Sequence, residues 1–150
     1  MKVSLKATYG ILAALDLALQ NGSAPVQSKA IARRQAIPVR FLEQVLHAMK
    51  KAGIVESLRG VHGGYVLGRQ PGEISLAEIV EALDGPLTPA QPRRTASSML
   101  SDRLKRDSVL APIWERLRQA ELAVLNTVTL TELVERQQEL EQKKVLMYHI

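Results

Sequence analysis

Four polar side chains between residues 40 and 47 have the types and the spacing that hydrogen bonding to nucleic-acid bases requires. They are Arg40, Glu43, Gln44 and His47, and their spacing places them on one face of an α-helix. Arginine donates two hydrogen bonds to guanine, glutamine pairs with adenine, and glutamate accepts from the cytosine amine. Because phosphates repel a carboxylate, Glu43 is better explained by sequence reading than by affinity. A surface pair between Glu43 and His47 is the alternative.

A second set of candidate residues surrounds a glycine-rich turn. Residues 59–64 read Arg-Gly-Val-His-Gly-Gly and predict the flexible tip of a β-hairpin. Arg59 suits a narrow, electronegative minor groove, and the Gly63 and Gly64 amides are able to donate to phosphates. A surface charge that stabilises the hairpin is the alternative for Arg59. The other predicted DNA-binding residues are His62, Lys6, Ser28, Lys29 and Lys51.

No arrangement of residues predicts catalysis or a metal site. The three histidines, His47, His62 and His149, fall on different predicted elements, and neither a phosphate-binding glycine loop before a helix nor an HExxH motif is present. The absence of cysteine excludes disulfides, zinc–thiolate sites and cysteine-ligated iron–sulfur clusters. We therefore expect no enzyme, no catalytic or metal-binding residue and no cofactor.

The positive charge is concentrated in the first half of the chain. The 150 residues carry a net charge of +5. Residues 1–72 hold ten Lys and Arg against three acidic residues, a net +7, whereas residues 73–150 hold ten against twelve, a net −2. An uneven basic charge of this kind is typical of a nucleic-acid contact, although a solvated basic face explains it equally well.

The elements that must position these side chains follow from the hydrophobic periodicity. It predicts helices near residues 5–19, 29–35, 38–52 and 75–84, strands at 54–58 and 65–67, and two further helices near 109–126 and 129–144. Ser28 is the expected N-cap of the second helix, and Ser75 and Glu78 are expected to form a capping box at the start of the helix near 75–84. Pro112 is expected in the first turn of the helix near 109–126. This order predicts a winged helix-turn-helix: a mostly α fold with a small β-hairpin wing.

We expect three segments. Residues 1–86 form the winged helix-turn-helix domain, residues 87–107 a loop, and residues 108–150 a long dimerisation helix with a C-terminal helix. An apolar stripe on the long helix needs a partner surface, either in a second copy or on its own domain. The stripe comprises Leu110, Ile113, Trp114, Leu117 and Val124.

Nothing in the sequence predicts a membrane segment. The apolar stretch at residues 9–19 is far shorter than the roughly 20 residues of a membrane span, and Asp16 interrupts it. We therefore expect a cytoplasmic protein.

Several stretches together resemble the IscR/NsrR/CymR family of bacterial winged-helix transcription regulators. They are residues 1–10, 37–46, 50–55, 58–65, 74–79 and 128–133, and the most specific is Leu-Arg-Gly-Val-His-Gly-Gly-Tyr at 58–65. The resemblance implies double-stranded DNA as the partner, bound by a homodimer at an imperfect palindrome. It also implies that the long helix pairs the two copies. We expect a sequence-specific regulator that acts as a repressor.

The chain departs from the family at the loop before the long helix. Well-known members bind an iron–sulfur cluster there through three cysteines, and this chain has none. It resembles the cluster-free branch, in which a small molecule or a partner protein acts as the effector. Arg93, Arg94, Arg103, Lys105 and Arg106 are candidates for binding an anion, although solvated surface charges are the simpler interpretation.

The competing interpretation is a winged-helix protein-interaction module that has lost DNA binding. Such a module would use the same basic surface for an acidic protein partner. Equal affinity for all promoter fragments, together with a stable protein complex, would distinguish it from a regulator.

Overall fold

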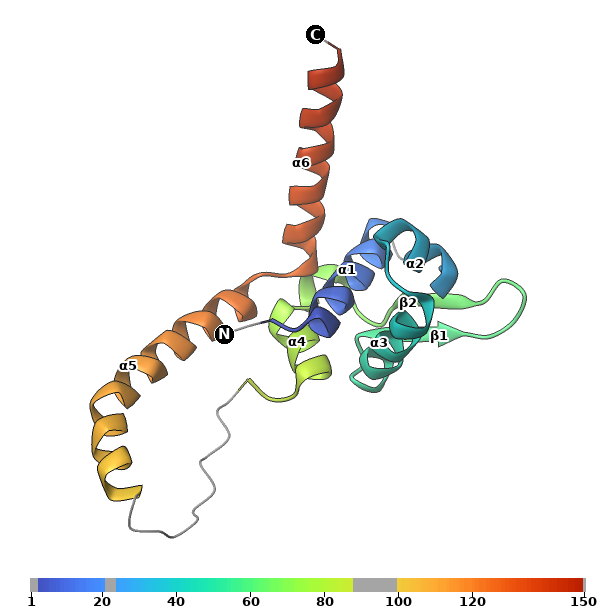
Figure 1. Cartoon of the computed structure of the whole chain (residues 1–150). Helices are drawn as coiled ribbons and strands as arrows, with labels where there is room; N and C mark the ends of the chain where they lie inside the picture. Colours follow the sequence, from blue (N-terminus) through green and yellow to red (C-terminus); the bar gives the residue numbers. More distant parts are fainter. Residues whose placement is uncertain (1–2, 21–23, 88–99, 150) are drawn as a thin grey trace.

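A computed structural model describes residues 3–20, 24–87 and 100–149, and of residues 100–108 it describes the backbone only. Six α-helices, one hairpin and a short 3-10 helix make up this part of the chain (Figure 1). In order they are α1 (Leu5–Leu19), α2 (Ser28–Gln35), α3 (Val39–Lys51), β1 (Val55–Leu58), β2 (Gly64–Leu67), η1 (Pro71–Glu73), α4 (Leu76–Asp84), α5 (Leu100–Thr127) and α6 (Leu130–Tyr148). The expected fold class, mostly α with a hairpin wing, is confirmed.

Helix α1 runs through the centre of the molecule and contacts α2, α3, α4 and α6. Gly10 lets α4 approach closely, because a Cβ atom at this position would collide with Leu83 and crowd Ile79. Apolar side chains from α1, α2, α3, α4 and α6, and from the residues just before β1 and just after η1, form the core around α1. Those that are almost fully buried include Leu17, Ile31, Leu42, Leu46, Met49, Ile54, Ile74, Ile79 and Leu130.

The hairpin forms next to α3 and projects from the helical body (Figure 1). Strands β1 and β2 pair antiparallel, with Val55 opposite Leu67 and Leu58 opposite Gly64. The strand ends agree with the predicted ranges to within one residue. Val55 is buried against the core, Leu58 at the tip end of β1 is exposed, and β2 is half-buried along its length.

Local signals at the helix ends were correct in some places and wrong in others. The Ser75 and Glu78 capping box at the start of α4 is confirmed, with reciprocal bonds of 3.3 and 3.0 Å. Ser28 is not the cap of α2. It is the first helical residue, and Gln27 takes the N-cap position without a side-chain hydrogen bond. The Gln27 carbonyl accepts the first backbone hydrogen bonds of the helix.

The two C-terminal helices leave the body in different directions (Figure 1). Helix α5 begins at Leu100 rather than near Val109, so Pro112 lies inside the helix and not in its first turn. The end of the segment predicted as loop is therefore helical, and residues 88–99 lie outside the described part of the chain.

Main-chain hydrogen bonds join the turn between α5 and α6 to the start of α4. Ser75 and Thr129 form an isolated antiparallel bridge. The Leu76 amide donates to the Val128 carbonyl at 2.9 Å, and the Leu130 amide donates to the Ile74 carbonyl at 3.1 Å. The C-terminal helices are thus joined to the winged domain through main-chain atoms.

Candidate nucleic-acid interface

Helix α3 has two faces of opposite character. Leu42, Val45, Leu46 and Met49 are buried on the inner face. The predicted base-reading residues are all exposed on the outer face together with Lys51. They are Arg40, Glu43, Gln44 and His47. The structure thus brings the predicted set together on one helix surface.

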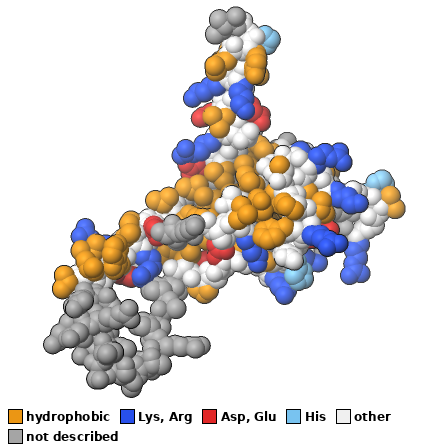
Figure 2. Space-filling view, in the orientation of Figure 1, with side chains coloured by type: hydrophobic (Ala, Val, Ile, Leu, Met, Phe, Trp, Pro, Cys, Tyr) orange, Lys and Arg blue, Asp and Glu red, His pale blue; other side chains and the backbone are white. Residues whose placement is uncertain are grey.

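The tip of the wing presents the second predicted set. Arg59 and His62 are exposed, and Val61 between them keeps 88% of its surface accessible. The Gly63 amide donates to the Gly60 carbonyl at 3.0 Å, which closes the turn. Figure 2 shows blue Lys and Arg side chains gathered on the side of the molecule that carries the wing.

An extended segment just before α2 pairs with strand β2 of the wing. This pairing was not predicted from the sequence. The Val26 amide donates to the Tyr65 carbonyl at 2.9 Å, and the Tyr65 amide donates back to Val26 at 2.8 Å. Gly64 makes this approach possible, since a Cβ atom there would lie 2.6 Å from the Val26 carbonyl carbon and oxygen. Ser28 and Lys29, at the start of α2, follow closely in the chain after Val26, the residue that pairs with β2.

A partly buried ion pair sets the position of α2 on α1. Asp16 is only 2% exposed, and it accepts hydrogen bonds from the Arg34 Nε and Nη2 atoms at 2.9 and 2.7 Å. The Gln35 amide donates to the same carboxylate at 3.1 Å. The hydrogen bond to Asp16 raises the pKa of the Arg34 guanidinium. The sequence signal for this ion pair was Asp16 itself, an acidic residue in an otherwise apolar helix, because a buried charge requires a partner.

Lys6 does not stand with the other predicted residues on α3 or the wing. It lies half-buried in the first turn of α1. One turn later in α1, the Tyr9 ring packs edge-on against Phe41 with 5.4 Å between ring centres. This contact orients α3 against α1.

The predicted dimerisation stripe is open to solvent in the single chain. Its five side chains keep between 45% and 60% of their surface exposed. Figure 2 shows hydrophobic side chains collected along α5, far from the wing. The stripe therefore does not pack back on its own domain. The loop residues Arg93 and Arg94 lie outside the described residues, as do the side chains of Arg103, Lys105 and Arg106.

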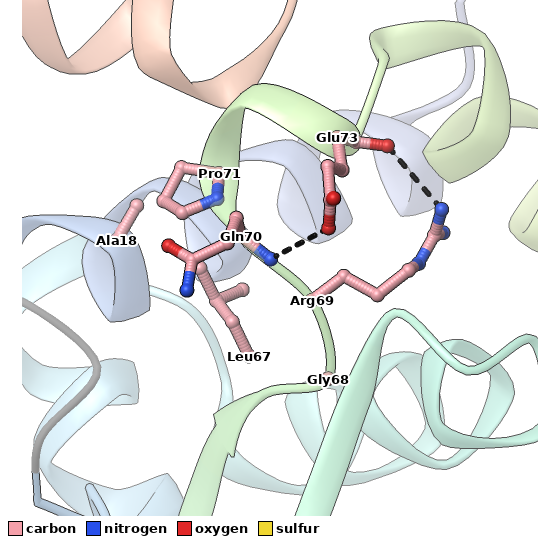
Figure 3. Close-up of a pocket in the computed structure, with 7 residues that line it drawn as sticks. All are labelled: Ala18, Leu67, Gly68, Arg69, Gln70, Pro71 and Glu73. Carbon is pink, nitrogen blue, oxygen red and sulfur yellow. Dashed lines mark hydrogen bonds between the residues drawn. The ribbon is translucent and has the colours of Figure 1, made fainter.

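A pocket of about 590 Å³ lies between the end of α1, the foot of the wing and η1 (Figure 3). The Arg69 Nη1 atom donates to the Glu73 carbonyl at 3.2 Å, and its Nη2 atom bonds the Glu78 carboxylate at 3.0 Å. The Gln70 amide donates to the Glu73 carboxylate at 3.3 Å. These bonds hold the polar groups to one another, so the pocket is a junction between the wing and η1.

A thiolate-bound iron–sulfur cluster does not fit this chain. Such a cluster needs cysteine ligands, and the sequence contains no cysteine. Within the described residues, no three His, Asp or Glu side chains lie together in a way that could hold a metal ion. Among the same residues, no helix has the length and apolar character needed to cross a membrane.

Comparisons with known proteins agree with this geometry. The model of the Rrf2 family, described as an iron-dependent transcriptional regulator, matches residues 3–136. The chain is 35% identical to the HTH-type transcriptional regulator CymR of Bacillus subtilis over 133 residues, which is 89% of each protein. It is 33% identical to the regulator IscR of Cronobacter sakazakii over 141 residues, covering 94% of this chain and 85% of that protein.

The solved structures give the same result. The fold is similar to that of CymR, the global cysteine regulator of B. subtilis, with a TM-score of 0.74 and 32% identity over 91% of this chain and 98% of that chain. It is also similar to IscR of T. potens, with a TM-score of 0.70 and 32% identity over 93% and 90%. These relatives are transcriptional regulators.

Proposed function

This chain belongs to the Rrf2 family of transcriptional regulators, and we propose that it is a homodimeric repressor that reads an imperfect palindrome in double-stranded DNA. DNA binding and transcriptional regulation follow from the family. One observation carries the proposal for sequence reading: the outer face of α3 presents exposed Arg40, Glu43 and Gln44 while its inner face is buried. In a helix-turn-helix protein, this helix lies in the major groove.

Selection of genomic fragments tests the proposed function. The full chain is mixed with fragmented DNA of its source organism, and the bound duplexes are sequenced and then titrated at several salt concentrations. We expect one palindromic sequence to be enriched and its affinity to fall steeply with salt, because bound Lys and Arg release counterions. A chain that binds no duplex, or all duplexes alike, contradicts the proposal. Transcription from the selected site with and without the chain distinguishes repression from activation.

Mutations distinguish the proposed base contact of α3 from its proposed phosphate contact. Glu43→Ala is expected to lose about 1–3 kcal/mol of discrimination at one base pair per half-site, because a lost base contact relaxes specificity there. Lys51→Ala is the matched control at the end of the same helix. It should weaken all sequences alike and reduce the salt slope by about one. Competition binding with single-base-pair variants of the selected site measures both effects.

Equal discrimination by wild type and Glu43→Ala, with unchanged affinity, would show that Glu43 faces no base. A Lys51→Ala variant that changes preference at one position and leaves the salt slope intact would show that Lys51 reads a base instead of a phosphate.

The proposed dimer rests on the exposed stripe of α5. Large apolar side chains spread along one long helix need a partner surface, and a two-fold axis through α5 supplies one from a second copy. Leu117 is 51% exposed near the middle of the stripe. Leu117→Ala is expected to weaken dimerisation at least about tenfold, since each buried leucine contributes about 1.5–3 kcal/mol. Sedimentation equilibrium over a concentration series measures this shift.

Val61→Ala is the control for the dimer, because Val61 is exposed at the tip of the wing. It should leave the association constant unchanged. An unaffected Leu117→Ala dimer, or a wild-type chain that stays monomeric at all concentrations, would rule out pairing through this stripe.

We also propose that the signal does not act through a cysteine-ligated cluster. The missing thiolates support this view, because they are the ligands that such clusters use. By its resemblance to the cluster-free branch of the family, we expect the effector to be a small molecule or a partner protein. Repeating the fragment selection with and without cell extract, before and after the extract is passed through a small-pore filter, separates the two.

A further inference from the structure

One apolar side chain interrupts the polar outer face of α3. Val39 is the first residue of this helix, and 38% of its surface is exposed. Glu43 follows one turn later on the same face, and Arg40 lies beside it. Among the described residues, Val39 is neither in the apolar core nor one of the hydrophobic side chains that pack against it. More than a third of its surface is therefore available to a partner outside the chain.

The backbone around Val39 is firmly held. Ile37 on one side is 4% exposed, and Leu42 in the next turn is fully buried. The Leu42 amide donates to the Pro38 carbonyl at 2.9 Å, which closes the first turn of α3. Valine in a helix has one strongly preferred side-chain rotamer. The position of the two methyl groups is thus set before any partner binds.

The position on α3 determines what such a side chain meets. Residues at the start of the second helix of a helix-turn-helix contact base edges in the major groove. The four base pairs present hydrogen-bond donors and acceptors there, and the apolar group among these features is the 5-methyl group of thymine. We propose that Val39 contacts the 5-methyl group of a thymine in each half-site and so selects thymine at that position. This inference rests on the proposed function, because it requires α3 in the major groove.

Deoxyuridine provides the test, since it lacks the thymine methyl group and keeps the pairing edge. The selected duplex is synthesised with thymine, and then with deoxyuridine at one thymine position of both half-sites at a time. Wild type should bind about fourfold more weakly per methyl group lost at one position, because burial of one such group is worth about 0.8 kcal/mol. Val39→Ala should bind the thymine duplex several-fold more weakly and no longer distinguish thymine from deoxyuridine there.

Val61→Ala is the matched control, because it removes the same two methyl groups from the exposed tip of the wing. The thymine methyl group lies in the major groove and not in the minor groove proposed for the wing. This variant should therefore distinguish thymine from deoxyuridine as well as wild type does. Thermal unfolding of both variants confirms that each is folded.

The outcomes separate this inference from the function on which it rests. Specific binding by wild type without any effect of deoxyuridine overturns the role of Val39 and leaves the regulator intact. Discrimination that persists in Val39→Ala, or an affinity equal to wild type, also overturns it. A wild-type chain that binds no duplex overturns both.

Discussion

Gly64→Ala is expected to destabilise the chain by about 3 kcal/mol and to lower its DNA affinity at least about tenfold. The added Cβ atom would lie 2.6 Å from the Val26 carbonyl, and these are main-chain atoms that no rotamer change can move. Relief of this overlap must break the two hydrogen bonds between Val26 and Tyr65. Each bond contributes about 1 kcal/mol, and the positive φ of Gly64 adds strain of about 1 kcal/mol or more.

Gly60→Ala is the matched control for this change. Gly60 also has a positive φ, of 111°, and lies in the same hairpin, but a Cβ atom there meets nothing within 4 Å. It should show the backbone strain alone, at about 1 kcal/mol. Urea unfolding of both variants measures the difference. Equal losses of stability would mean that the Val26 segment does not hold the wing.

Removal of Arg34 is expected to cost more stability than removal of its partner. Arg34→Ala leaves the Asp16 carboxylate buried beside Gln35 without its cation, and we expect a loss of about 2 kcal/mol. This value is below the roughly 3–5 kcal/mol of fully enclosed pairs, because Arg34 is itself 41% exposed and water replaces it. Asp16→Asn should cost about 1 kcal/mol, since a neutral amide at that site needs no counter-charge and the exposed guanidinium stays solvated.

Arg33→Ala is the control for Arg34, because Arg33 is the exposed neighbour on the same helix. It should change the free energy of unfolding by less than about 0.5 kcal/mol. Urea unfolding at neutral pH gives all three values. If Asp16→Asn proves as damaging as Arg34→Ala, the carboxylate is not the group that needs its partner.

The exposed polar face of α3 and the glycine-rich tip of the wing were predictable because their signals are local. The helical spacing of polar and apolar residues along α3 is recognised without knowledge of the rest of the fold. The glycines at 60, 63 and 64 mark a turn between two strands. The exposed faces of α3 and the wing follow from these patterns. The predicted N-cap of α2 was wrong by one position. Ser28 and Gln27 are adjacent in the chain, and helix propensity alone does not locate a helix end to a single residue.

The contacts that hold this surface in place were not predictable in the same way. The pairing of Val26 with Tyr65 joins segments far apart in the chain and depends on how α1 packs against α3. Asp16 needed a basic partner, but the choice between Arg33 and Arg34 is decided by the rotation of α2 about its axis. The start of α5 was misplaced because Pro112 usually marks the first turn of a helix, whereas here it lies well inside one.

The main-chain bonds between the α5–α6 turn and the start of α4 have a consequence for substitutions. Because the hydrogen bonds of Leu76 and Leu130 join main-chain atoms, they do not depend on which side chains those residues carry. Changes of exposed side chains along α5 and α6 therefore leave the attachment of these helices to the winged domain in place.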